Sequence, residues 1–414
     1  MKGLKLSGTL QDAPLPGNQY KTVVAPAWDK SVGSTMNLSL TDYDSLYQNV
    51  VRDLTSRSGE YDVFGLDLLW TGQFAVGGSV EFLDDMVAKD ADLSKNVNKV
   101  LLDGVRWQGD LVGLPATNQS WNLFYRKDVF EKQGLQPPEN WDDFLGIAKE
   151  LTHDWAGDGK DHYGVAMNCV RGAPVAHDWL GYFAAMGGQV FDNWPDTEAT
   201  NYKPQLNSDA AVQALQLLMD MRQYAPGDVL TYDWNKTQAA FASGKVAMIC
   251  SWNDGTAAQA FADGSPIADN VGWARLPNSP GIDRFDPRGF WGISVNGAGD
   301  STNAAFNFLA FGLSKEMQRQ MVANLPGTVP VRDDLIGELK SDSGPNAYLG
   351  FIEEINGNSN PMNFAWRPTL PEWSSIQDAL GLALNQALTG QASVTDALNQ
   401  ANSEVEKAME KAGH

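Results

Sequence analysis

The titratable side chains are the first place to look for chemistry in this chain. Glycoside hydrolysis needs two carboxylates at a defined separation, and 51 Asp and Glu residues offer many pairs. The nucleophile motif GxSxG, the zinc motif HExxH and the phosphate-binding motif GxxxxGK[ST] do not occur in the sequence. The four histidines, at positions 153, 162, 177 and 414, show no zinc-ligand spacing. We therefore expect no catalytic residues, no metal and no cofactor.

The two cysteines lie in apolar segments, and each segment predicts a buried strand. Cys169 ends Val165–Cys169 and Cys250 ends Val246–Cys250. The two thiols form a disulfide if their Cα atoms come within about 7 Å of each other. Otherwise they are two buried free thiols, and the sequence leaves both outcomes open.

Several polar and aromatic residues follow predicted strands and are suited to binding a carbohydrate. Sugars are held by hydrogen bonds from Asp, Asn, Gln and Arg and by stacking on aromatic rings, and the chain contains 14 Trp. Ligands of open α/β sheets bind beyond the carboxyl ends of the strands. The candidate ligand contacts are Gln11, Asp12, Asp67, Trp70, Asn118, Gln119, Asn168, Arg171, Gly172, Trp252, Asn253, Trp273, Trp291 and Arg367.

Each candidate also has a purely structural interpretation. Asp67 could cap a helix and Trp70 could belong to the core, while Arg171 could be a surface residue and Trp273 part of a strand. Arg367 could form a salt bridge between lobes. If it faces the ligand, its planar guanidinium suits a carboxylate, a sulfonate or paired hydroxyls.

The elements that would position these residues alternate between strands and helices. We expect strands at Leu4–Ser7, Met36–Leu40 and Tyr61–Asp67, and a helix after the second strand that Thr41 could cap. This β-α-β-α-β order predicts a mostly parallel sheet with helices on its faces. Later we expect strands at 118–125, 165–169 and 246–250, and helices starting near 140 and spanning 209–223, 372–388 and 393–411.

Length and charge restrict the classes of protein further. A chain of 414 residues is too long for one hydrophobic core, so two domains are expected. No apolar stretch approaches the roughly 20 residues of a membrane span. The net charge of -21 favours solubility and disfavours nucleic acid and anionic membranes as partners. An acidic ligand stays open, because one local Arg can override the overall charge.

Six segments, taken in order, resemble a known family. They are Tyr61–Asp67 with Trp70, Gly113–Pro115 with Phe124–Phe130, Ala184–Gly188, Gly244–Met248, Gly289–Val295, and Arg367-Pro368 with Pro371–Trp373. Their order is similar to that of the extracellular solute-binding proteins of carbohydrate ABC transporters, the maltose-binding-protein-like family. Most of the chain is covered by the resemblance.

The resemblance implies a two-lobed α/β fold with the ligand between the lobes and a chain that crosses more than once. We expect residues 1–116 and 277–330 in one lobe and residues 117–276 and 331–414 in the other. The implied function is to capture a sugar, polyol or sugar derivative by lobe closure and to deliver it to a membrane permease. A monomer is expected, and crossing segments would act as a hinge.

Other interpretations stay open beside this one. A secreted glycoside-processing enzyme that uses cleft carboxylates is the main alternative, and a lectin-like receptor without transport is a third class. Residues 1–8 contain no signal-peptide core, which is typical of a cytoplasmic protein or of a mature chain whose signal was removed. The resemblance favours the second, and with it a periplasmic or extracellular location.

Overall fold

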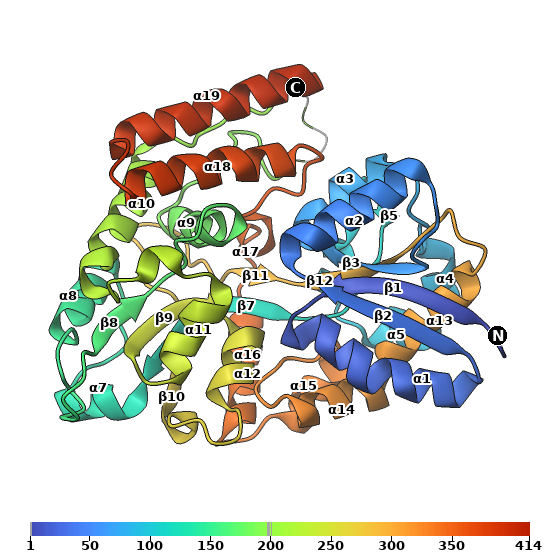
Figure 1. Cartoon of the computed structure of the whole chain (residues 1–414), viewed down its shortest axis with the longest axis horizontal. Helices are drawn as coiled ribbons and strands as arrows, with labels where there is room; N and C mark the ends of the chain where they lie inside the picture. The colour runs from blue at the N-terminus through green and yellow to red at the C-terminus, as the bar shows by residue number, and fades with distance from the viewer. Residues whose placement is uncertain (1, 197–198, 200) are drawn as a thin grey trace. The chain divides into compact units, whose positions relative to one another are not determined.

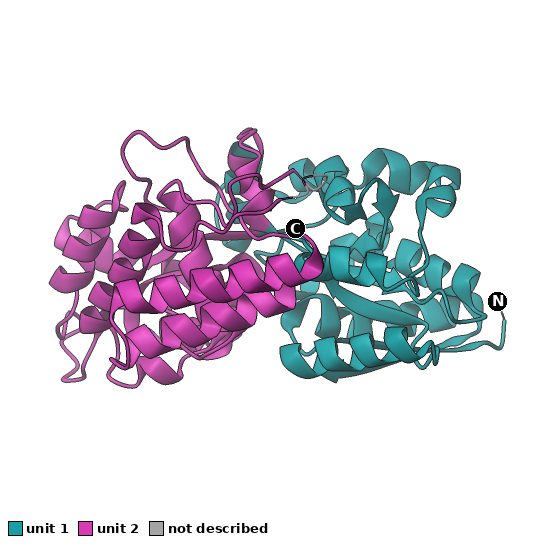
Figure 2. Ribbon diagram, turned by 90° about the horizontal axis from the view of Figure 1, so that it is seen from above, with its two compact units in different colours: residues 1–119, 289–354, 369–371 teal, residues 120–288, 355–368, 372–414 magenta. Residues whose placement is uncertain are grey.

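A computed structural model describes residues 2–196, 199 and 201–414. The chain forms two compact units, each a sheet flanked by helices (Figure 2). Unit 1 contains residues 1–119, 289–354 and 369–371, and unit 2 contains residues 120–288, 355–368 and 372–414. The predicted two-lobed α/β class is confirmed.

The sheet of unit 1 has the strand order β2-β1-β3-β12-β6. Strand β1 (Lys5–Gln11) runs parallel to β2 (Thr35–Thr41) and β3 (Val63–Asp67), as the β-α-β pattern predicts. Strand β12 (Trp291–Val295) is antiparallel to β3 and to β6 (Leu114–Pro115). It runs the other way because the chain enters it from unit 2 and not through a crossover helix.

Helices pack on this sheet through apolar side chains. In the core, the ring of Trp28 lies 5.6 Å from the ring of Phe308, and its indole N–H donates to Asn307 over 2.9 Å. The helices of unit 1 are α1 (Ala25–Val32), α2 (Tyr43–Ser56), α3 (Thr71–Val76), α4 (Asp84–Lys89), α5 (Ala91–Asn96), α6 (Lys99–Gly104), α13 (Thr302–Gly312), α14 (Lys315–Asn324) and α15 (Asp333–Leu339). A short hairpin, β4 (Arg106–Trp107) and β5 (Asp110–Leu111), lies outside the main sheet.

The start of α2 differs by one residue from the prediction. Asp42, not Thr41, is the N-cap, and its carboxylate accepts a hydrogen bond of 3.0 Å from the Ser45 N–H. Thr41 is still part of β2, where it pairs with Gln11. The prediction was wrong because the strand continues one residue further than its apolar pattern.

The sheet of unit 2 has the order β10-β7-β9-β8. Strand β8 (Tyr163–Ala166) is parallel to β9 (Val246–Trp252), while β7 (Gln119–Arg126) is antiparallel to β9 and to β10 (Val271–Ala274). The expectation of a mostly parallel sheet is therefore wrong for this unit. Strand β7 enters directly from unit 1 without a crossover helix, so its direction is not fixed by a β-α-β connection.

Long helices cover unit 2, and α18 and α19 lie side by side (Figure 1). Helix α19 starts after Ser393, whose side chain accepts a hydrogen bond from the Asp396 N–H. The helices are α7 (Lys127–Gln133), α8 (Trp141–Glu150), α9 (Ala173–Ala185), α10 (Asp209–Met221), α11 (Trp234–Ala242), α12 (Asn253–Ala260), α17 (Met362–Ala365), α18 (Trp373–Leu388) and α19 (Val394–Ala412), and α16 (Tyr348–Asn356) spans the boundary at 354.

The sequence raised the questions of a disulfide and of a membrane span, and the structure bears on both. Cys169 and Cys250 are free thiols, and both are buried. Among the described residues, no helix has the length and apolarity that a membrane crossing requires.

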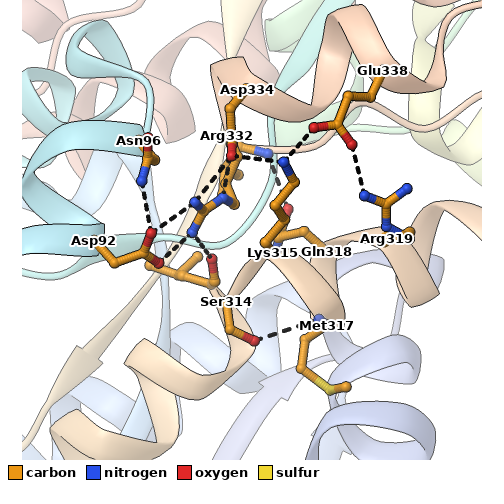
Figure 3. A network of polar contacts seen from close by, with 12 residues as sticks. Asp92, Asn96, Ser314, Lys315, Met317, Gln318, Arg319, Arg332, Asp334 and Glu338 are labelled. Carbon is orange, nitrogen blue, oxygen red and sulfur yellow. Dashed lines mark hydrogen bonds and ion pairs between the residues drawn. The ribbon is translucent and has the colours of Figure 1, made fainter.

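Residues 277–288 belong to unit 2, whereas we expected them in the lobe of residues 1–116. Residues 331–354 belong to unit 1, whereas we expected them in the lobe of residues 117–276. The physical reason for this second difference is a polar network around Arg332 (Figure 3). Its guanidinium side chain is only 1% exposed and donates to Asp92 in α5 over 2.6 and 2.9 Å. It also donates to Asp334 over 2.9 Å and to the Leu313 carbonyl over 3.2 Å. Arg332 thus ties the start of α15 to two other segments of unit 1.

We predict that Arg332→Ala lowers the free energy of unfolding by about 3 kcal/mol, because a buried set of charge-assisted hydrogen bonds and the packing of the stem are lost. Urea denaturation followed by circular dichroism measures this. The control is Lys407→Ala, which removes an exposed pair with Glu404 and should change stability by less than about 0.5 kcal/mol. Equal effects of the two variants would contradict the structural role given to Arg332.

Candidate functional site

In unit 1, Asp67 lies at the carboxyl end of β3 and is buried. Its carboxylate accepts a hydrogen bond of 2.9 Å from the Tyr43 hydroxyl and one of 3.3 Å from the Leu69 N–H. The second bond makes Asp67 the cap of a short 3-10 turn, Leu68–Trp70. The carboxylate is therefore held in one orientation at the edge of the sheet where ligands of such folds bind.

Aromatic rings cluster around Trp70, three residues after Asp67, within unit 1. The ring of Trp70 lies 5.1 Å from Tyr43, 5.3 Å from Tyr47 and 5.5 Å from Trp291. Trp291 stands opposite Asp67 in the β12–β3 ladder. Trp70 is 2% and Trp291 7% exposed, so both rings are packed against neighbours over most of their surface. The cluster offers ring edges and a fixed acceptor, the combination that suits hydroxyl groups and C–H faces.

The ends of β1 and β2 add further polar groups to the same edge. Gln11 is partly exposed and Asp12 is exposed, where it accepts a hydrogen bond from Asn18. In the described part of the chain, the buried Oγ1 of Thr41 and Oε1 of Gln19 have no hydrogen-bond partner. Buried polar atoms of this kind usually find a partner in water or ligand.

Asn118 directly precedes β7 and Gln119 is the first residue of that strand, and both are buried. The Asn118 amide donates to the Pro330 carbonyl over 3.3 Å. Nearby, the Thr117 hydroxyl accepts a hydrogen bond of 2.7 Å from the Trp291 N–H. These contacts fix the end of the first segment of unit 1 against β12 and residue 330 before the chain enters unit 2.

In unit 2, Arg367 lies over two tryptophans. Its guanidinium carbon is 4.6 Å from the Trp366 ring centre and 4.9 Å from the Trp252 ring centre. The Trp366 indole N–H donates to the Arg288 carbonyl over 2.9 Å, which orients the ring. Arg367 is 3% exposed, and cation–π contact of this kind holds its guanidinium against both rings. Trp252 ends β9 and is partly exposed.

His177 in α9 contributes to the same region of unit 2. Burial lowers the pKa of His177 well below its usual value, and the charge of Arg367 lowers that pKa further. Its Nε2 lies 3.2 Å from Oε1 of Gln377, an atom that also accepts the Trp373 indole N–H over 3.1 Å. His177 is therefore neutral at pH 7, whereas Arg367 carries a positive charge.

Asn253 and Asn168 follow β9 and β8 and are both 1% exposed. Oδ1 of Asn253 accepts the Ser120 N–H over 2.9 Å, which joins α12 to β7. Asn168 donates from its amide nitrogen to Asp178 over 2.8 Å and accepts from the Thr237 hydroxyl over 2.8 Å. Its backbone N–H also donates to Asp178, over 2.9 Å.

The remaining candidates lie in different settings. Arg171 is exposed and Gly172 is partly exposed, in the loop between β8 and α9. Trp273 lies in β10 opposite Phe124 of β7 and is partly exposed. The structure thus brings Asp67, Trp70 and Trp291 together in unit 1, and Trp252 and Arg367 together in unit 2.

Sequence reasoning missed several residues of these clusters. Tyr43 and Tyr47 lie on the first turns of α2, Trp366 precedes Arg367, and His177 and Asp178 lie inside α9. The spacing of Tyr43 and Tyr47 at i and i+4 would have placed both rings on one face of α2. For Asp178, the only signal was a carboxylate within an otherwise apolar helix, which is unusual unless the carboxylate has a partner.

Two other features lie apart from these clusters. A surface hollow of about 570 Å³ between α8 and α10 has Trp141, Leu217 and Asp220 among its lining residues, and no candidate ligand contact is among them. Among the described residues, one group of three could ligate a metal: Asp154, Asp158 and His162, whose ligand atoms lie within 4.8 Å of one another. Asp154 there accepts backbone N–H groups of its own loop.

Comparisons with known proteins give a consistent family. Residues 13–319 match the family model of the bacterial extracellular solute-binding proteins. A solved solute-binding protein of an ABC transporter from Agrobacterium radiobacter K84, in complex with ribitol, is 28% identical with a TM-score of 0.88, and the match covers 98% of this chain and 99% of that one.

Two curated relatives differ in the ligand that their names state. A mannitol-binding protein from Pseudomonas aeruginosa is 24% identical over 89% of this chain and 85% of the relative. A probable amino-acid ABC transporter periplasmic-binding protein from Sinorhizobium fredii is 24% identical over 72% of this chain. That alignment spans 65% of the Sinorhizobium protein, less than two thirds of its length.

We predict a pH-dependent stability difference between the wild type and Asp178→Asn. Burial raises the pKa of Asp178 from 3.8 to about 7. Between these two values the folded state binds a proton that the unfolded state releases, so rising pH favours unfolding of the wild type only. The stability advantage of the wild type over the variant should fall from about pH 4 to about pH 7 and stay constant above. Urea midpoints of both proteins at four pH values measure this, and a difference that grows with pH would contradict it.

Proposed function

The chain belongs to the bacterial extracellular solute-binding proteins, and from that premise we propose that it captures a neutral polyol or sugar for an ABC importer. It releases this ligand unchanged to a membrane permease. The ribitol-bound structure and the mannitol-binding relative support a polyol as the ligand class. We propose that the protein acts as a monomer outside the cytoplasmic membrane, as members of an extracellular family do.

The observation that carries this proposal is the stack of Trp366, Arg367 and Trp252 in unit 2. The guanidinium is held close to both indole rings. A guanidinium is planar, and its N–H donors match two neighbouring hydroxyl oxygens. The partly exposed ring of Trp252 offers a surface for C–H groups. N–H donors that lie in one plane beside an aromatic face suit the hydroxyl groups and C–H groups of a polyhydroxylated ligand.

Charge supports a neutral ligand. Asp67 in unit 1 offers an acceptor, and Arg367 in unit 2 offers donors. His177 is neutral, so it adds no charge beside Arg367. A hydroxyl both donates and accepts, so a polyol satisfies both groups without leaving a net charge.

The proposal requires a ligand that contacts both units. A ligand shifts a conformational equilibrium only by its difference in affinity for the two states. A ligand bound by one unit alone would not favour closure, so the permease could not distinguish a loaded from an empty protein. We therefore propose that both clusters contribute to one bound ligand.

We propose that no reaction follows binding. A glycosidase needs one carboxylic acid and one carboxylate on either side of the scissile bond. Asp67 accepts hydrogen bonds from Tyr43 and Leu69, and Asp178 accepts hydrogen bonds from Asn168. These two buried carboxylates serve as fixed acceptors within their own units.

We predict that a polyol or sugar raises the melting temperature of the protein. The panel contains ribitol, D-mannitol, erythritol, maltose, glucuronate and glutamate, each tested by thermal shift. A ligand at 100 times its Kd stabilises the native state by about 2.7 kcal/mol, which corresponds to a shift of a few degrees in a protein of this size. Arg367→Ala should abolish the shift, while Arg319→Ala, at a surface pair with Glu338, should retain it.

A shift with glutamate and none with any sugar or polyol would contradict the proposed ligand class. A shift with glucuronate alone would mean that Arg367 binds a carboxylate and that the ligand is anionic. Loss of a bound glycoside to hydrolysis during the assay would support the enzyme alternative instead.

A further inference from the structure

Asn168 lies at the centre of a buried chain of hydrogen bonds in unit 2. The Thr237 hydroxyl of α11 donates to Asn168 Oδ1 over 2.8 Å, and Asn168 Nδ2 donates to Asp178 of α9 over 2.8 Å. All three side chains are 1% exposed. Both ends of the Asn168 amide are therefore occupied by partners inside the unit, which leaves it poorly placed to bind a ligand directly.

The loop that carries Asn168, residues 167–172, is fixed at three consecutive backbone N–H groups. The Asn168 N–H donates to Asp178 over 2.9 Å, and those of Cys169 and Val170 donate to the Tyr232 carbonyl over 2.9 and 3.0 Å. The two hydrogen bonds to Tyr232 involve only backbone atoms and no side chain. Asp178 accepts hydrogen bonds from both the backbone N–H and the side-chain amide of Asn168 in this loop.

The far end of the same loop also has a restricted position. Gly172 has φ +103°, a conformation that side chains other than glycine rarely adopt. Its backbone lies so close to Gly381 of α18 that a Cβ on Gly381 would be 2.7 Å from the Gly172 Cα. The loop is therefore positioned against α18 as well as against α9 and α11, and a small displacement of it has no free space on that side.

This loop leads into α9, and α9 carries a residue of the region around Arg367. It follows the carboxyl end of β8, beside the end of β9 that carries Trp252. It presents Arg171, which is exposed, and it leads into α9, where His177 lies within electrostatic reach of Arg367 and contacts α18 through Gln377. Asp178 is the next residue of that helix.

We propose that Asp178, acting through Asn168, is a positioning residue for ligand capture: it holds the loop 167–172 and the first turns of α9 in the arrangement that binds the ligand. The inference rests on the proposed function and assigns Asn168 a role beneath the binding surface in place of direct contact. According to this inference, binding requires the hydrogen-bond chain and does not require the charge of Asp178.

The chain can form with either protonation state of Asp178. When Asp178 is ionised, it accepts from Asn168, and Asn168 accepts from Thr237. When Asp178 is protonated, its O–H can donate to Asn168 Oδ1 after the amide turns over, and Asn168 then donates to the Thr237 oxygen. The other titratable or charged groups near this chain are Cys169, Cys250, Tyr182, Arg222 and His177. Burial raises the pKa of both thiols and of Tyr182, so these groups are neutral at pH 7.

The same reasoning explains how substitutions should behave. Asp178→Asn has the same shape and can form the reversed chain, so we expect it to retain wild-type binding. Asp178→Ala leaves the Asn168 N–H and amide without an acceptor, so the loop should loosen. Thr237→Val tests the chain from its other end, while Thr237→Ser keeps the hydroxyl and should behave as the wild type.

Two readouts on the full-length protein test the proposal. Hydrogen exchange by mass spectrometry reports the protection of peptides that cover residues 167–172, and calorimetry reports the Kd for ribitol, or for the polyol with the largest thermal shift. We expect Asp178→Ala to speed exchange in the loop and to weaken Kd by about ten-fold, the size of one lost buried hydrogen bond to a charged group. Asp178→Asn should match the wild type in both readouts.

The control is Leu215→Ala, a fully buried residue of α10 in the same unit. It should lower overall stability without changing loop exchange or Kd. A general loss of binding in Leu215→Ala as well would overturn the positioning role, because binding would then follow stability alone. Faster loop exchange in Asp178→Ala with an unchanged Kd would also overturn it. If Asp178→Ala does not fold, Thr237→Val with wild-type exchange and Kd would overturn it.

Different results would contradict the proposed function and this inference. Wild-type protein that binds no sugar or polyol would contradict the function before any variant is measured, and with it the claim that the loop serves ligand capture. Wild-type binding together with an Asp178→Asn variant that loses it would leave the function intact and contradict the positioning chain.

Discussion

Burying a charged group costs several kcal/mol unless hydrogen-bond partners surround it, and both units of this protein are organised around such groups. Asp67 is held by Tyr43 and Leu69, and Asp178 by Asn168. Arg332 is held by two carboxylates and a carbonyl, and Arg367 lies on two indole rings. Each of these arrangements fixes the element that carries the buried group, so the hydrogen-bond and ring partners of these side chains determine how nearby loops are held.

We propose that this constraint separates residues that contact the ligand from residues that hold the contacting residues in place. Arg367 and Trp252 combine donors in a plane with a partly exposed ring, which suits a polyhydroxylated ligand. Asn168 and Asp178 satisfy each other within unit 2, so their contribution is the position of the loop above them. Binding without chemistry depends on groups that are arranged before the ligand arrives, because ordering them on binding would reduce affinity.

Much of the fold could be predicted from the sequence because its signals are local. The β-α-β pattern gives the parallel strands β1, β2 and β3, and caps such as Ser393 mark helix starts. The direction of β7 depends on how the chain enters unit 2, and no local pattern encodes that. The assignment of residues 331–354 depends on the contact of Arg332 with Asp92, 240 positions away in the chain.

The candidate site shows the same division. Residues that follow strands, such as Asp67, Trp252 and Asn253, could be selected by the rule that ligands bind at strand ends. Whether Asn168 faces a ligand or a partner depends on Asp178 and on Thr237, which is distant in sequence. Such hydrogen bonds join side chains that are far apart in the sequence and close in space, so the periodicity of the sequence does not predict them. The amino-acid composition likewise could not show that the Trp366 ring would pack against the Arg367 guanidinium.

The central claim is that one ligand, bound by both units, closes the protein without being changed. Small-angle X-ray scattering of the purified protein, with and without a saturating polyol, tests it most directly. The account predicts a smaller radius of gyration with ligand, at an unchanged monomer mass, and a return to the starting value when the intact polyol is dialysed away. A radius of gyration that stays constant while calorimetry shows the same polyol bound would contradict it.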